Sequence, residues 1–237
     1  MLPTEKTPVV NDLGGLTLFV YGPPKIGKST WCSQVDGLLF LATEPGLNSL
    51  EVFQKPITGW PDMMDVCADI AQGDHGYKAI AIDTADNAWS FCSQYICAQE
   101  RVVHESDLDW GKGWNMVKKE FHRVLTKLAH LPYGLILTSH AKTIEVKTRT
   151  DKYNKVIPTL GQGGRDIILG MADMILYCTL ENVEGEGGEV VPTRIMRTKP
   201  DLFYEAGDRT SRMPETIPLD YAAFLEAFNQ GHKEPQE

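Results

Sequence analysis

The sequence predicts an α/β protein in which helices cover both faces of a mainly parallel sheet and an antiparallel hairpin lies near the C-terminus. Along the 237 residues, short apolar runs typical of buried strands alternate with longer amphipathic segments typical of helices. A glycine-rich segment, residues 22–29, follows the first apolar run, and another, residues 184–188, separates the last two. We expect one domain at residues 16–229, with an N-terminal arm at 1–15 and a flexible tail at 230–237.

The apolar runs and the amphipathic segments set the order of the elements. Strands are expected at residues 16–21, 37–44, 77–83, 134–140, 171–179 and 190–198. Helices are expected from residue 29 and at residues 61–72, 85–102, 114–130, 166–170 and 219–229. Residues 106–113 are expected to form a loop, whereas residues 141–165, which are polar and basic, predict a long loop or a flexible hairpin.

The net charge, the cysteines and the lengths of the apolar runs argue against several classes of function. The net charge of −9 and the pI near 5.2 argue against a surface that binds nucleic acid everywhere, but they allow a local basic groove. Five cysteines without a C-x-x-C pair indicate reduced thiols and a cytoplasmic location. The chain shows neither a signal-peptide pattern nor an apolar run near the ~20 residues that span a bilayer.

The segment at 22–29 matches G-x-x-x-x-G-K-[ST], the phosphate-binding P-loop, and it lies between an expected strand and an expected helix. In such a loop the backbone N–H groups surround phosphate, Lys28 reaches the β- and γ-phosphates, and the Ser29 hydroxyl coordinates Mg²⁺. The residues expected to bind a nucleoside triphosphate are Gly22, Pro23, Pro24, Lys25, Ile26, Gly27, Lys28, Ser29 and Thr30.

Three further polar positions follow strands that should share the sheet edge with the P-loop. Asp83 is expected as the Walker-B aspartate that holds Mg²⁺ through water, although an Asp also commonly ends a strand. Glu44, expected one strand away from the phosphates, can deprotonate the attacking water, or it simply begins a Glu-Pro-Gly turn. His140 or Ser139 can sense the γ-phosphate, and a surface histidine is the alternative.

These features, in this order, resemble the core of RecA-type ATPases, and the resemblance covers residues from about 16 to 198. In that family a glutamate closes the strand after the P-loop helix, as Glu44 does here. The next strand after Walker B often ends in Gln, where this chain has Ser139 and His140. The compact size and the segments at 136–142 and 197–209 look more specifically like short phage-encoded RecA-like ATPases associated with single-strand annealing and recombination.

The resemblance implies that the segment after the sensor strand, residues 141–165, binds single-stranded DNA. Its six basic and two acidic residues give it a charge of +4, against −9 for the whole chain, although a charged run is also typical of a solvated loop. Gly161, Gly163 and Gly164 are expected to let this loop follow a DNA strand. The expected DNA-binding residues are Lys142, Lys147, Arg149, Lys152, Tyr153, Lys155 and Arg165.

The resemblance also implies that Arg197 and Lys199 enter the nucleotide site of a neighbouring protomer. They are two residues apart at the end of the last expected hairpin strand, so both should point to one face, and a charged edge strand is the alternative interpretation. If they act in this way, the active form is an oligomer, either a ring or a filament, with nucleotide between protomers.

Three functional hypotheses follow. The first is an Mg-dependent, DNA-stimulated ATPase that acts on single-stranded DNA in recombination or annealing. A single-strand-binding protein is a candidate partner, and no binding to a membrane is expected. The second is a P-loop kinase for a small molecule, which predicts an Arg-rich lid and no base at Glu44. The third is a non-catalytic assembly switch or loader. Turnover of ATP with and without single-stranded DNA distinguishes them.

Overall fold

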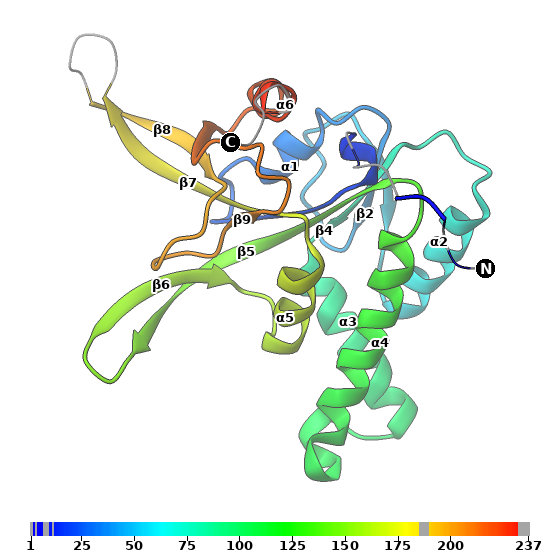
Figure 1. Cartoon of the computed structure of the whole chain (residues 1–237). Coiled ribbons are helices and arrows are strands. Elements are labelled where there is room, and N and C mark those ends of the chain that lie inside the picture. Colours follow the sequence, from blue (N-terminus) through cyan, green and yellow to red (C-terminus); the bar gives the residue numbers. More distant parts are fainter. Residues whose placement is uncertain (1, 3, 7–9, 11, 185–189, 232–237) are drawn as a thin grey trace.

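A computed structural model describes residues 2, 4–6, 10, 12–184 and 190–231, and these form a sheet with helices on both faces (Figure 1). The strand order is β10-β8-β7-β1-β5-β4-β2-β3. All pairs from β7 to β3 are parallel, while β8 and β10 add antiparallel strands at the C-terminal edge. The predicted α/β class, mainly parallel sheet and C-terminal hairpin are therefore confirmed, and the fold is that of a P-loop NTPase.

The strands are β1 (Thr17–Gly22), β2 (Leu38–Ala42), β3 (Phe53–Pro56), β4 (Ala79–Asp83), β5 (Gly134–Lys147), β6 (Lys152–Pro158), β7 (Met174–Glu184), β8 (Val190–Arg197), β9 (Gly207–Asp208) and β10 (Thr216–Pro218). The helices are α1 (Lys28–Cys32), α2 (Trp60–Gln72), α3 (Ala85–Glu100), α4 (Lys112–Ala129), α5 (Gln162–Met171) and α6 (Tyr221–Gln230). The sequence did not predict the short strands β3, β9 and β10.

Two apolar cores hold the layers together because side chains alternate across each strand. In β1, Phe19 and Tyr21 face the core under α2, α3, α4 and α5, whereas Leu18 and Val20 face the core under α1 and α6. Every residue of β1 is buried, as expected for a parallel strand covered on both sides. Burial on both faces explains why this strand appears in the sequence as an uninterrupted apolar run.

Helix α4 shows how one amphipathic pattern sets a helix orientation. Its buried residues lie on the stripe predicted from the sequence, and they include Val117, Phe121, Val124, Leu125 and Leu128. Between α3 and α4 the structure has two 3₁₀ turns, η2 (Glu105–Asp107) and η3 (Asp109–Gly111), where the sequence predicted a loop. None of the helices in the described residues combines the length and apolar character that a bilayer crossing requires.

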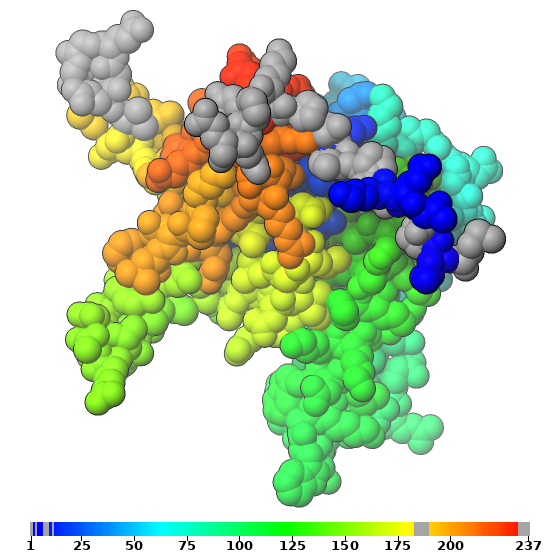
Figure 2. All heavy atoms as spheres, in the orientation of Figure 1, coloured from blue at the N-terminus to red at the C-terminus, as the bar shows by residue number. Residues whose placement is uncertain are grey.

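The segment at 141–165 is a hairpin rather than a long loop. Strand β5 continues to Lys147 and pairs antiparallel with β6, from Ala141 opposite Pro158 to Lys147 opposite Lys152. We call residues 141–158 the arm, and it projects from the body of the protein at the lower left of Figures 1 and 2. The expected loop also ends earlier than predicted, because α5 begins at Gln162 and includes Gly163 and Gly164.

Those glycines have a packing role that the sequence did not reveal. A Cβ added to Gly161, Gly163 or Gly164 would lie 2.6, 2.9 or 2.7 Å from the ring of Trp89 in α3. The glycines therefore let α5 pack directly on that ring, and the expectation that they allow a loop to follow DNA is wrong. The predicted turn at 184–188 and tail at 230–237 lie outside the described residues, apart from residues 184, 230 and 231.

Candidate functional site

The P-loop connects the end of β1 to the start of α1 and requires glycine at both ends. A Cβ on Gly22 would lie 2.4 Å from the carbonyl oxygen of Cys178 in the neighbouring strand β7. Gly27 has φ +119°, a backbone conformation that other residues rarely adopt. The loop can therefore pass close to β7 and turn into α1 only with glycine at these positions.

Lys28 is held inside the P-loop. Its Nζ donates hydrogen bonds to the carbonyl oxygens of Gly22 (2.9 Å) and Pro23 (3.0 Å), and the residue is 6% exposed. Burial lowers the pKa of Lys28, and the nearby Asp83 carboxylate opposes that shift. A poorly solvated ammonium group that donates to two carbonyls is well suited to exchange them for phosphate oxygens.

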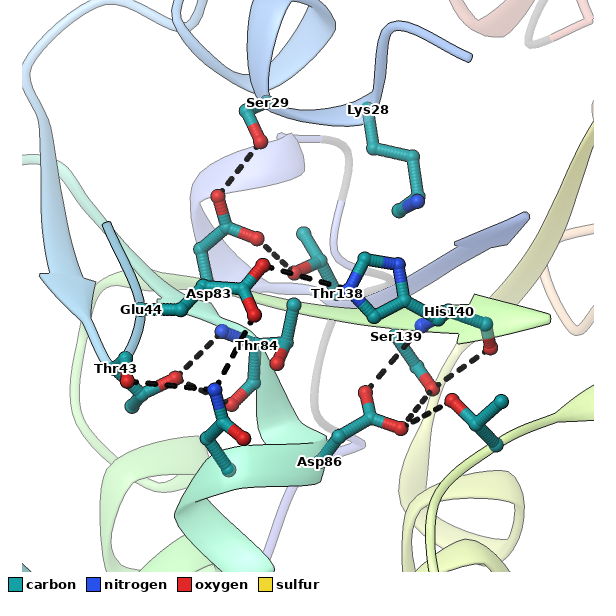
Figure 3. Close-up of polar contacts among 12 residues, drawn as sticks. Lys28, Ser29, Thr43, Glu44, Asp83, Thr84, Asp86, Thr138, Ser139 and His140 are labelled. Carbon is teal, nitrogen blue, oxygen red and sulfur yellow. Dashed lines mark hydrogen bonds and ion pairs between the residues drawn. The ribbon is translucent and has the colours of Figure 1, made fainter. Parts of the chain in front are cut away.

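Ser29 and Asp83 meet as the sequence predicted for a magnesium site (Figure 3). The Ser29 hydroxyl donates to Asp83 Oδ2 at 2.7 Å, and the Thr138 hydroxyl donates to Asp83 Oδ1. Asp83 ends β4, and Thr138 lies on the adjacent strand β5. A hydroxyl and a carboxylate are oxygen ligands of the kind that Mg²⁺ prefers, so this pair fits the metal.

Glu44 follows β2, but its strand is farther from the P-loop than the sequence suggested. Strands β4 and β5 both lie between β2 and β1, whereas Glu44 was expected one strand away from the phosphates. The side chain still turns toward the site, because Glu44 Oε1 lies 3.4 Å from His140 Nε2 at the end of the buried part of β5. Glu44 is thus part of the same cluster as Asp83 and His140.

The neighbours of Glu44 fix its orientation, and sequence analysis missed one of them. Asn87, in the first turn of α3, donates from Nδ2 to Glu44 Oε2 at 3.2 Å. Thr43 and Thr84 join the ends of β2 and β4: the Thr84 N–H donates to Thr43 Oγ1 (2.7 Å), which donates to Thr84 O (2.9 Å). The one feature of the sequence that could have indicated this role of Asn87 was its position four residues after Asp83.

Of the two predicted sensor residues, His140 faces Glu44 and Ser139 does not. Ser139 is fully buried, and its hydroxyl donates to Asp86 Oδ1 at 3.1 Å. His140 Nδ1 is buried without a hydrogen-bond partner among the described residues. The geometry therefore favours His140 as the group with an unused polar atom beside the site, while a sensor role for either residue stays a prediction.

Asp86 connects this site to the base of the arm. It accepts hydrogen bonds from the hydroxyls of Ser139 (3.1 Å) and Thr159 (2.5 Å) and from the His140 N–H (3.3 Å). Thr159 directly follows the end of β6, and Ser139 and His140 lie on β5 just before the arm, so one carboxylate joins α3 to both sides of the base of the arm. Sequence analysis did not select Asp86, since its partners come from segments far apart in the chain.

Arg197 and Lys199 do not share a strand face as predicted. Strand β8 ends at Arg197, and Lys199 lies beyond it. Arg197 forms a two-pronged ion pair with Glu181 (3.0 and 2.5 Å), and Lys199 Nζ lies 3.4 Å from Asp208. Both cations therefore have partners in their own chain, and their proposed entry into a neighbouring site stays a prediction.

The predicted DNA-binding residues are spread over two faces of the arm. Cross-strand pairing places Lys142, Tyr153 and Lys155 on one face and Lys147 and Lys152 on the other. Lys155 is 2.9 Å from Glu205, so part of the charge on the first face is neutralised within the chain.

The other two predicted DNA-binding arginines lie elsewhere. Arg149 occupies the turn of the arm, between β5 and β6. Arg165 belongs to α5 rather than to the arm. The exposed cations at the end of the arm are Lys147, Arg149 and Lys152, and Lys147 Nζ lies 3.1 Å from Glu145 Oε1, so part of the charge at this end is also neutralised within the chain.

Comparison with known proteins identifies related sequences. Residues 15–210 match the sequence model of the AAA_24 family, described as an AAA domain. The chain is also 25% identical over 182 residues to the SPbeta prophage-derived uncharacterized protein YorG of Bacillus subtilis (strain 168). That alignment covers 74% of this chain and 54% of the relative, so the chain spans about half the length of the curated protein it matches. The family match includes the P-loop, Glu44, Asp83, His140 and the arm.

Proposed function

Because the chain belongs to the AAA_24 family of P-loop ATPases, we propose that it hydrolyses Mg-ATP and couples hydrolysis to single-stranded DNA in a phage-type recombination or annealing reaction. The observation that carries the proposal is the convergence of Lys28, Asp83 and Glu44 at one sheet edge, directly beside the base of a basic arm. The prophage origin of the relative supports the phage setting.

ATP binding uses the P-loop and the two groups that it presents. The Lys28 ammonium exchanges the carbonyls of Gly22 and Pro23 for phosphate oxygens, which compensate its charge better than carbonyls do. The Ser29 hydroxyl and the Asp83 carboxylate would hold Mg²⁺, which neutralises phosphate charge when bound. The backbone N–H groups of residues 22–29 orient the phosphates.

Hydrolysis requires a group that accepts a proton from the attacking water, and Glu44 has this role in the proposal. Asn87 holds one of its carboxylate oxygens, which leaves the other directed toward His140 and the sheet edge. A positioned general base typically contributes about 10²- to 10⁴-fold in rate. Removing the negative charge of Glu44 while keeping its shape should therefore abolish most turnover and leave ATP binding intact.

DNA binding is assigned to the exposed end of the arm, around Lys147, Arg149 and Lys152. Cations on a narrow two-stranded projection can neutralise the backbone phosphates of a DNA strand. The base of the arm contacts Asp86 through Thr159, and Asp86 also holds the backbone of His140. Movement of the arm on binding DNA would thus reach the residue that faces Glu44.

The test measures ATP turnover with and without single-stranded DNA for the wild type, Lys28→Ala and Glu44→Gln. We expect DNA-stimulated hydrolysis in the wild type, loss of ATP binding in Lys28→Ala, and binding without turnover in Glu44→Gln. Full turnover by Glu44→Gln would refute the assignment of the base. Binding of ATP by the wild type without any turnover would favour the assembly switch, and transfer of phosphate to a small molecule would favour the kinase.

The DNA part has its own matched pair of variants. Lys147→Ala/Lys152→Ala removes two charges from the arm, and Lys119→Ala/Lys127→Ala removes two exposed charges from α4. For single strands, two lost phosphate contacts should reduce the slope of log K against log salt by about 1.4. Only the arm variant should show this change; equal effects of the two variants would refute the arm as the DNA-binding surface.

The proposal includes self-assembly into a ring or filament with nucleotide between protomers. Light scattering with a slowly hydrolysed ATP analogue, with and without single-stranded DNA, measures the assembly directly. If Arg197 acts on a neighbouring nucleotide, it must leave Glu181, so Glu181→Gln should promote ATP turnover at high protein concentration. A monomer with full activity at every concentration would refute this part.

A further inference from the structure

Arg194 lies on β8, on the face that looks toward the P-loop helix. Side chains two residues apart on a strand share a face. Met196, two residues further along, is completely buried in the core under α1 and α6. Arg194 therefore projects to the same side of the sheet as α1, while Arg197 projects to the opposite side and pairs with Glu181.

The guanidinium group of Arg194 approaches the P-loop backbone at Gly27. The position that a Cβ of Gly27 would occupy is 3.8 Å from Arg194 Nη1 and 3.5 Å from Leu219 Cδ2. The backbone also holds this contact in place, because the Leu219 N–H donates to the Arg194 carbonyl oxygen at 3.0 Å. Gly27 thus lets a cation from the C-terminal part of the chain reach the phosphate-binding loop.

The packing of α6 keeps this arrangement rigid. Trp31 of α1 is 1% exposed and makes edge contacts with the rings of Tyr221 (5.3 Å) and Phe224 (5.1 Å) in α6. Helix α6 begins two residues after Leu219, and the P-loop helix, α6 and the end of β8 share one apolar core, so they form one packed unit. Arg194 is therefore held next to the P-loop by the fold of the same chain.

Arg194 also differs from the neighbouring cations in its partners. Arg197 is paired with Glu181, and Lys199 with Asp208. Within the described part of the chain, the exposed guanidinium of Arg194 forms no hydrogen bond or ion pair. Its five N–H donors remain available to an anion, and a guanidinium matches phosphate oxygens in shape as well as in charge.

We propose that Arg194 binds nucleotide in cis, with its guanidinium donating hydrogen bonds to a phosphoryl oxygen of the ATP held by the same chain's P-loop. The inference rests on the ATP binding of the proposed function and adds a residue outside the P-loop motif. Arg194 would thus act on the nucleotide bound by its own chain, whereas Arg197 and Lys199 were expected to act on the nucleotide of a neighbouring protomer.

The test compares Arg194→Ala and Arg194→Lys with Arg101→Ala, which removes an exposed arginine at the end of α3. A fluorescent ATP analogue measures affinity, and competition with inorganic tripolyphosphate isolates the phosphate contacts. Loss of one charge-assisted contact should weaken both ligands about 10-fold in Arg194→Ala. Arg194→Lys should retain part of the affinity, Arg101→Ala should match the wild type, and thermal melting should show all three variants folded.

A mixing experiment separates action in cis from action on a neighbour. Lys28→Ala protein keeps Arg194 but lacks a competent P-loop, so it can supply the arginine only in trans. Adding it to Arg194→Ala protein should restore no ATP affinity or turnover; recovery would overturn the assignment to cis.

Two further outcomes distinguish this inference from the proposed function. If the wild type binds ATP and Arg194→Ala binds ATP equally well, only the role of Arg194 is overturned. An unchanged affinity for tripolyphosphate in Arg194→Ala would likewise overturn the phosphate contact. If the wild type binds no ATP, the proposed function fails, and this inference fails with it.

Discussion

Replacing Gly164 by alanine tests whether α5 is packed on Trp89 or belongs to a loop that follows DNA. In the structure, a Cβ at residue 164 would lie 2.7 Å from Trp89 Cε3 and 3.3 Å from Leu160 Cδ1. Trp89 cannot easily move away, because its ring already packs edge-on against Phe121 with centroids 5.1 Å apart. Gly170, in the same helix, is the matched control, since no described residue beyond its chain neighbours and its own helix backbone lies within 4 Å of its Cβ position.

The expected magnitude follows from two opposing terms. Alanine favours a helix over glycine by about 1 kcal/mol, and this term applies to both positions. Forcing an extra methyl group into a packed contact costs about 1–3 kcal/mol, and this term applies to Gly164 only. Gly164→Ala should therefore have a free energy of unfolding about 1–3 kcal/mol lower than Gly170→Ala, and Gly170→Ala should be at least as stable as the wild type.

Thermal unfolding is the assay, with DNA affinity measured on the same variants. For a chain of this size, 1 kcal/mol corresponds to about 2–4 °C in Tm. A second variant, Trp89→Leu, should reduce the cost of Gly164→Ala, because the two substitutions act on one contact. Equal stabilisation by Gly164→Ala and Gly170→Ala, together with weaker DNA binding in the former, would refute the packing argument and restore the flexible-loop interpretation.

Three further predictions follow from single contacts. Asp86→Ala removes the acceptor for Thr159, so we expect about 2–4 kcal/mol lower stability in urea unfolding and a larger loss of DNA-stimulated than of basal ATPase activity, with Asp86→Asn intermediate. Burial raises the pKa of the Cys178 thiol to about 12, so iodoacetamide should alkylate it at pH 8 at least ~1,000-fold more slowly in the native than in the unfolded chain; equal rates would contradict its burial. Asp220 caps α6 through the Ala223 N–H (2.9 Å), and Asp220→Ala should cost about 1 kcal/mol in the same urea assay.

Local patterns were enough to predict the parts of the fold that depend on neighbouring residues. The prediction of strand β1 was correct because a strand covered on both faces favours apolar residues at every position. The prediction of helix α4 and of its buried face was correct because a helix covered on one side carries an apolar stripe. The arm was ambiguous, since its alternating polar and β-branched residues suit both an exposed hairpin and a loop until the pairing of β5 with β6 is known.

The sequence by itself was enough to predict that a P-loop joins a buried strand to a helix. All the residues that define this motif, its glycines, lysine and serine, lie within the short segment 22–29. Only the tertiary structure decided which residues surround it. The sheet order sets two strands between Glu44 and the P-loop, the carboxylate of Asp86 meets Thr159 from 73 residues away, and Arg194 reaches Gly27 across the packed C-terminal unit. Such neighbours depend on strand order and helix packing, which are properties of the whole chain and leave no local pattern in the sequence.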